Sequence, residues 1–211
     1  MRDLSVRAIG AAAVFMALLA ATRAATITVS SSDVPKLIPD NNPAGIVSVL
    51  TGPDLVIADL DLILDEIWHE SVCDLHVELT APSGTRVTLM KANSEDGILA
   101  NELFPENFAS TVLDDDAPVN LADGADPYTG SFNIEHESVV ASPLSEFDGE
   151  NASGTWTLFV SDLFREDSGR LTGWSLRFEA VPEPNAFILL SVGAVCLLAY
   201  AWRWRRGWVR P

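Results

Sequence analysis

The longest run of acidic residues in the sequence is Asp114, Asp115 and Asp116, and two more aspartates follow in a segment with glycine and proline. Calcium in proteins takes roughly six to eight oxygen ligands from carboxylates and loop carbonyls. The sequence therefore predicts a calcium site at Asp114, Asp115 and Asp116, with Asp74 as a further ligand. The spacing is not that of an EF-hand loop, and a solvated acidic loop is the alternative interpretation.

Nucleophilic catalysis would need a different set of residues. Serine proteolysis requires a nucleophile, a base within hydrogen-bond reach and a third group that orients the base. The histidines are His69, His76 and His136, and none begins a His-Glu-x-x-His zinc motif. We expect a structural role for His69 and an outward-facing strand position for His76. A subtilisin-like catalytic domain would need a far longer chain, so the sequence predicts no enzyme.

The net charge of the central region excludes one class of partner. Residues 26–181 contain 28 Asp and Glu against six Lys and Arg, a net charge of −22, whereas the whole chain carries −17. A surface this acidic repels polyanions over long distances and favours solubility or divalent cations. We therefore expect no nucleic-acid partner.

The N-terminus has the order of a secretory signal peptide. Basic residues Arg2 and Arg7 precede a short apolar stretch, and small residues follow at positions 22 and 24. The apolar stretch is too short to span a bilayer comfortably, and small residues suit signal peptidase. We assign residues 1–25 to a signal peptide, with an uncleaved membrane anchor as the alternative.

The C-terminal segment, residues 181–211, contains a Pro-Glu-Pro motif, an apolar run over residues 186–202 and then a cluster of arginines. The apolar run has about the minimum length of a membrane-spanning helix. Arginines behind such a helix remain on the cytoplasmic side, which places the preceding domain outside. The motif residues are Pro182, Glu183, Pro184, Arg203, Arg205 and Arg206.

These three features, in this order, resemble the PEP-CTERM sorting signal. The resemblance implies recognition and processing by an exosortase, a membrane transpeptidase-like enzyme. It also implies an exported protein of the cell envelope or extracellular space, held in the membrane by its C-terminal helix before processing. A plain single-pass anchor is the alternative.

The region between these ends, residues 26–180, has the pattern of short β-strands. Apolar residues alternate with polar ones over residues 60–65, 75–80 and 87–90, and again over residues 156–160. A Pro/Gly turn at residues 81–85 separates two of these runs, which predicts a hairpin. Trp156 and Trp174 are expected in the core. The pattern predicts an all-β fold, a β-sandwich or jelly roll.

Four blocks in this region are similar to the P/Homo B domain, which follows the subtilisin-like catalytic domain in proprotein convertases. They cover residues 74–89, 107–117, 143–158 and 160–178. The resemblance spans roughly residues 48–179. It implies a jelly-roll β-sandwich of the galactose-binding-like type, flanked here by the signal peptide and the transmembrane helix.

Together these features predict an exported, exosortase-sorted and non-catalytic surface module for adhesion or for binding extracellular matrix or a partner. The alternative is an accessory domain that stabilises a subtilisin-like serine endopeptidase. The expected partners are an exosortase, the membrane through the C-terminal helix, and either a protease or an extracellular polymer.

Overall fold

The computed structural model describes residues 24–92, 106–134, 143–182 and 186–207. The chain divides into a β domain, Ala25–Val181, and a second unit that contains the helix α2 (Ala186–Gly207). Each unit is described by itself. Nearly all of the predicted signal peptide, residues 1–23, lies outside the described residues.

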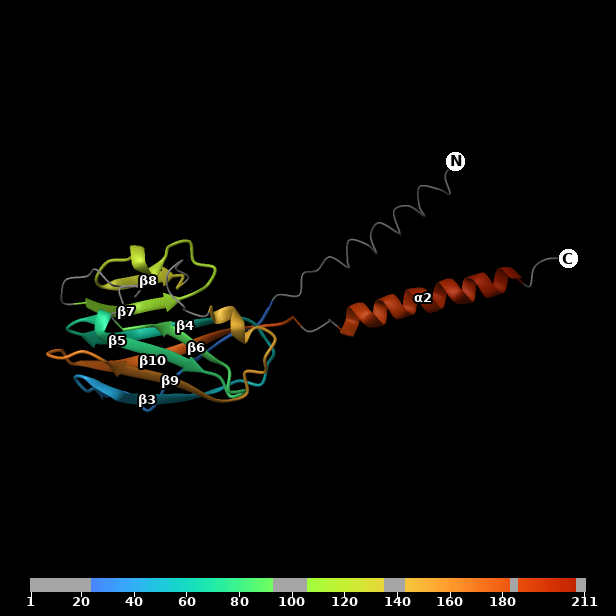
Figure 1. Ribbon diagram of the computed structural model, residues 1–211. Coiled ribbons are helices and arrows are strands. Elements are labelled where there is room, and N and C mark those ends of the chain that lie inside the picture. The colour runs from blue at the N-terminus through green and yellow to red at the C-terminus, as the bar shows by residue number, and fades with distance from the viewer. Residues whose placement is uncertain (1–23, 93–105, 135–142, 183–185, 208–211) are drawn as a thin grey trace. The chain divides into compact units, whose positions relative to one another are not determined.

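Within the described residues, the strands of the β domain form two sheets (Figure 1). The first sheet has the order β1 (Thr26–Ser30), β10 (Gly169–Ala180), β4 (Ile57–His69), β7 (Glu106–Leu113) and β8 (Tyr128–Phe132), with β2 (Lys36–Ile38) also paired to β10. The second has the order β3 (Asn42–Gly52), β9 (Gly154–Asp162), β5 (Leu75–Thr80) and β6 (Arg86–Met90). Short 3-10 turns lie at η1 (Val72–Asp74), η2 (Leu121–Asp123) and η3 (Leu144–Phe147).

The core lies between the two sheets because alternate residues of each strand point to the same face. Trp156 of the second sheet packs against Phe178 of the first, with ring centroids 5.6 Å apart. Trp174 of the first sheet donates from Nε1 to Oγ of Ser48 in the second, at 2.7 Å. Both tryptophans are fully buried, which confirms the prediction that they belong to the core.

The predicted hairpin is also confirmed. Strands β5 and β6 pair antiparallel, and the turn between them is closed by a bond from the amide of Ala81 to the carbonyl of Thr85 at 2.9 Å. Gly84 has a φ of +96°, a conformation that a side chain would strain. The segment 26–30 forms the edge strand β1 beside β10.

The all-β sandwich is therefore confirmed, while the jelly-roll assignment of the galactose-binding-like type stays a prediction. The apolar run 186–202 lies inside α2, which confirms a helix there. In the part of the chain that the structure describes, no helix is both long enough and apolar enough to cross a membrane. The membrane span predicted for residues 186–202 thus stays a prediction.

Candidate functional site

The three aspartates of the predicted calcium site directly follow β7, and two of them already bind backbone amides. Asp114 accepts from the amide of Asp116 at 2.8 Å through Oδ1, and Asp115 accepts from the amide of Ser145 at 2.7 Å through Oδ2. The other oxygen of Asp115, Oδ1, is buried and has no hydrogen-bond partner among the described residues. Two of these carboxylates thus hold the loop and tie it to the start of η3.

Acidic neighbours surround this loop on both sides. Burial, and then the charges of Asp115 and Asp116, raise the pKa of Asp148. On the first sheet, burial and the charges of Asp61, Asp114 and Glu179 raise the pKa of Asp59 to about 6. The loop is therefore strongly acidic, and Arg177 is a cation that interacts with Asp114.

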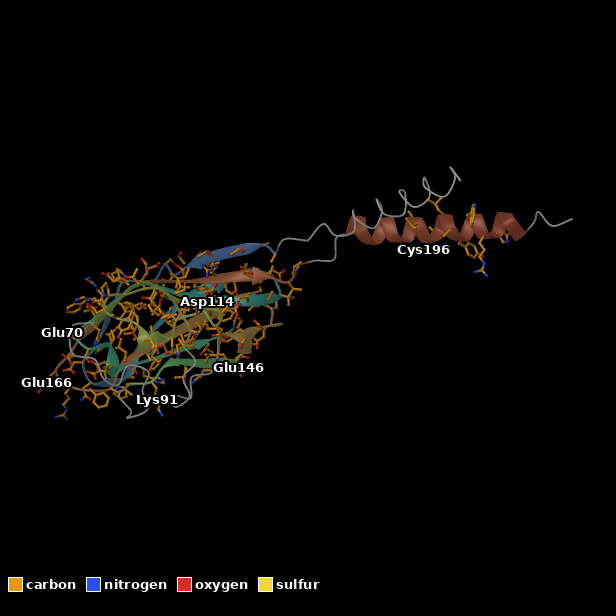
Figure 2. All side chains as sticks on the ribbon, turned by 90° about the horizontal axis from the view of Figure 1, so that it is seen from above. Glu70, Lys91, Asp114, Glu146, Glu166 and Cys196 are labelled. Carbon is orange, nitrogen blue, oxygen red and sulfur yellow. The ribbon has the colours of Figure 1, made fainter. Side chains whose placement is uncertain are left out.

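Asp74 belongs to a different part of the domain. It ends η1, and its carboxyl lies beside those of Asp162 and Asp167 rather than beside Asp114. Figure 2 shows Glu70, near η1, well apart from Asp114. Among the described residues, no three His, Cys, Asp or Glu side chains are grouped so that they would hold a metal ion. The structure therefore does not join Asp74 to the predicted calcium ligands.

His69 lies beside Asp162, one of the carboxylates that neighbour Asp74. Both side chains are fully buried, and Nε2 of His69 lies 3.4 Å from Oδ2 of Asp162. Nδ1 of His69 accepts from the amide of Ser71 at 3.0 Å, so a neutral ring carries its proton on Nε2, facing Asp162. The other oxygen of Asp162 accepts from the amide of Phe164 at 2.9 Å. This arrangement fits the structural role expected for His69.

Sequence reasoning missed the pairing of Asp61 with Arg177. The alternation over residues 60–65 places Asp61 on the outer face of β4, yet its side chain is only 2% exposed. Arg177 lies opposite it on β10 and donates from Nε to Oδ2 of Asp61 at 2.6 Å. The guanidinium covers the carboxylate, and 116 residues separate the two in the sequence.

The stability of the domain should depend on pH through Asp59 and Asp74. Burial, together with neighbouring carboxylates, raises the pKa of each to about 6, against about 3.9 for an unfolded aspartate. Between these values the folded state holds more protons than the unfolded state, so stability falls as pH rises from about 4 to 6. After allowance for solvent screening, we expect these two groups to lower the free energy of unfolding by about 2 kcal/mol between pH 4.5 and 7.

Asparagine at position 74 tests this expectation because it resembles the protonated acid. Asp74→Asn should raise the urea midpoint at pH 7 and leave it nearly unchanged at pH 4.5. Glu146→Gln, an exposed change of the same charge, is the matched control and should have little effect at either pH. A midpoint for Asp74→Asn that is displaced equally at both pH values would contradict the expectation.

Calcium binding at Asp114, Asp115 and Asp116 stays a prediction. Loop carbonyls and water would have to supply most ligands, so we expect weak binding, on the order of millimolar. Calcium should then raise the thermal midpoint in a saturable way, by linkage between binding and folding. The rise should vanish with chelator and in Asp114→Asn and Asp115→Asn. A rise that sodium chloride reproduces at equal ionic strength would remove the prediction.

The residues of the predicted sorting motif are only partly described. Pro182 follows the β domain and is exposed, whereas Glu183 and Pro184 lie outside the described residues. Arg203 is an exposed residue of α2. Arg205 and Arg206 are in the last turn of the same helix, and their side chains lie outside the described set.

Comparisons with known proteins give two family matches. The proprotein convertase P-domain model matches residues 64–178, and the PEP-CTERM protein-sorting motif matches residues 180–206. Both resemblances predicted from the sequence are thereby confirmed. No curated protein matches the chain.

Several solved structures are similar to the chain. A serine protease of Aeromonas sobria is 18% identical over 74% of this chain, with a TM-score of 0.42. The Aeromonas sobria serine protease in complex with a chaperone is 21% identical over 80% of it, with a TM-score of 0.40. The VP2 subviral particle of infectious bursal disease virus is 13% identical over 74%, with a TM-score of 0.30. This chain spans 27%, 29% and 33% of those chains, respectively.

The sorting motif marks an exported protein of the cell envelope or extracellular space, anchored in the membrane before an exosortase processes it. The P-domain match covers more than half of the chain, from within β4 to within β10, and leaves out β1, β2 and β3. The chain belongs to the proprotein convertase P-domain family.

Proposed function

We propose that this exported accessory module acts at the cell surface by binding an extracellular polymer or protein partner, without catalysing a reaction. The observation that carries the proposal is a groove of about 840 Å³ on the outer face of the second sheet, lined by residues of β3, β9, β5 and β6. Concave surfaces with a few polar groups are the usual form of binding sites. P domains are non-catalytic accessory domains, which agrees with a binding role.

A sedimentation experiment tests this proposal. The fragment 25–181 contains a complete core of its own, so it is suited to expression without the tail. Mixed with the extracellular matrix fraction of the producing cells, it should sediment with that fraction in a saturable way. An unrelated domain of similar size and charge is the control. Recovery of all of the fragment in the supernatant at every concentration would contradict the proposal.

One observation favours the second candidate function, support of a subtilisin-like protease. On the outer face of the first sheet, Leu37 of β2 and Trp68 of β4 are 74% and 41% exposed. Both lie beside Arg170 of β10, which pairs with Leu37 on one side and with Trp68 on the other. Exposed apolar side chains in one row are typical of a surface that contacts another protein.

A thermal unfolding experiment with a subtilisin-like protease from the same cells distinguishes the two functions. If the chain supports such an enzyme, adding it in excess should raise the thermal midpoint of the catalytic domain, and Trp68→Ala should remove this rise. If matrix binding is the function, Trp68→Ala should sediment like the unchanged domain, and the protease midpoint should not move.

A further inference from the structure

The strand register places side chains of β5 and β9 together on the floor of the groove. Residues of β5 and β9 that face each other point to the same side of the sheet. His76 lies opposite Ser161, and Glu78 lies opposite Phe159. The rings of His76 and Phe159 meet edge to face at 6.2 Å. The floor is therefore an aromatic surface bordered by polar groups, rather than a continuous apolar patch.

The groove also differs from the rest of the domain in charge. Among the residues that the structure describes, Glu78 is the one acidic side chain that lines the groove, whereas Arg86 and Lys91 are two of the six basic residues between positions 26 and 181. Arg86 pairs with Glu78 at 3.1 Å and remains 64% exposed on its side chain. Figure 2 shows Lys91 well apart from Asp114 of the acidic loop. A negatively charged ligand is thus repelled elsewhere and accepted here.

The groove contains a polar atom that still needs a partner. Ser161 is 1% exposed, and its Oγ has no hydrogen-bond partner among the described residues. A buried hydroxyl without a partner is costly, and a ligand hydroxyl would satisfy it. Three threonines also line the groove and supply further donors and acceptors.

An extended peptide fits this surface less well than a sugar. Peptides that add to β-sheets bind through main-chain bonds at an exposed strand edge. The floor of the groove instead lies over β5 and β9, whose backbones are paired along their length. Recognition over this floor is therefore by side chains, which include hydroxyls, the rings of His76 and Phe159, two cations and the carboxylate of Glu78.

We propose that this groove binds an oligosaccharide that carries carboxylate groups, of the uronate type. A sugar ring packs on the face of Phe159, its hydroxyls meet Ser161 and the threonines, and its carboxylates meet Arg86 and Lys91. The inference rests on the proposed function, a module that binds an extracellular partner, and names the chemistry of that partner.

Titration calorimetry with three defined hexamers tests the chemistry. The probes are hexagalacturonate, the neutral maltohexaose and a hexaglutamate peptide, each added to fragment 25–181. Hexagalacturonate should bind at least about tenfold more tightly than the other two, because only it offers both sugar rings and carboxylates. Equal binding of maltohexaose would contradict the role of the carboxylate groups. Equal or tighter binding of hexaglutamate would contradict the inference that the ligand is a sugar. No binding of any hexamer would overturn the inference itself.

Variants inside and outside the groove test whether hexagalacturonate binds there. Phe159→Ala should weaken hexagalacturonate about tenfold, whereas Trp68→Ala, an exposed aromatic on the other sheet, should leave it unchanged. Lys91→Gln should weaken it about threefold to tenfold and reduce its salt dependence. Arg170→Gln, which removes the same charge outside the groove, should not. Circular dichroism confirms folding of each variant, and equal loss in groove and control variants would overturn the assignment.

The matrix experiment separates failure of this inference from failure of the proposed function. If wild-type fragment and Phe159→Ala both sediment with the matrix fraction, the module binds a partner, but the groove is not where it does so. If the wild-type fragment does not sediment at all, the proposed function itself fails.

Discussion

Replacing Trp156 with alanine should lower the free energy of unfolding of the β domain by about 3–5 kcal/mol, the usual cost of removing a large buried aromatic side chain. Trp156 is fully buried, packs against Phe147 at 5.0 Å and Phe178 at 5.6 Å, and donates from Nε1 to the carbonyl of Ala152 at 2.8 Å. The change leaves a cavity between the sheets and strips that carbonyl of its donor.

Urea unfolding followed by fluorescence measures the effect, since other tryptophans of the domain still report on folding. Trp68→Ala is the matched control, because Trp68 is 41% exposed, and exposed positions usually change stability by less than about 0.5 kcal/mol. Equal losses in the two variants would show that Trp156 does not lie in the core that joins the sheets.

The second large effect is expected at the ion pair between β4 and β10. Arg177→Met leaves the buried carboxylate of Asp61 without its cation, among the further negative charges of Asp114 and Glu179. Breaking a fully buried pair costs about 3–5 kcal/mol. Because the side chain of Arg177 is 36% exposed, solvent screening reduces the expected loss to about 2–3 kcal/mol at pH 7.

A double variant distinguishes loss of charge pairing from loss of packing. In Arg177→Met the loss should shrink toward pH 4.5, because burial already raises the pKa of Asp61 and removal of the cation raises it further. Asp61→Leu combined with Arg177→Met removes both charges and should restore stability to near the starting value. A double variant as unstable as Arg177→Met would show that packing of the guanidinium, rather than its charge, holds this part of the sheet.

Local features of the fold were predictable because they depend on near neighbours in sequence. The turn at Gly84 is set by a glycine between two alternating runs, and the hairpin follows from that turn. The burial of Trp156 and Trp174 follows from their size and from the alternation around them. The family matches likewise depend on residues contiguous in the chain.

Contacts between distant strands were not predictable from one sequence. Asp61 meets Arg177 because the register of β4 and β10 places them opposite each other. His69, the last residue of β4, meets Asp162, the last residue of β9 in the other sheet. Asp74 resembled one more oxygen ligand for the acidic loop, yet it lies beside Asp162 and Asp167. The amino-acid composition shows that the domain is acidic, but only the register of the strands shows where its few basic residues lie.

The groove was missed for a similar reason. In the alternating run 156–160, Phe159 occupies an outward position, which the sequence of one strand predicts to face solvent. In the folded sheet, side chains of the neighbouring strand β5 lie beside Phe159, and together they form the floor of the groove. A sequence signal did exist, because a large aromatic ring on the polar side of a strand is unusual there, although it does not name a ligand.

The place of β10 in the first sheet determines how the domain carries mechanical load. The tail leaves the domain directly after this strand, which is flanked by β1 and β2 on one side and by β4 along nearly its whole length on the other. Hydrogen bonds between antiparallel strands run perpendicular to the strands. Tension along an anchored tail would therefore shear the many bonds of β10 together, instead of peeling an edge strand away one bond at a time. A domain tethered in this way resists drag at a surface far better than one held by its outermost strand.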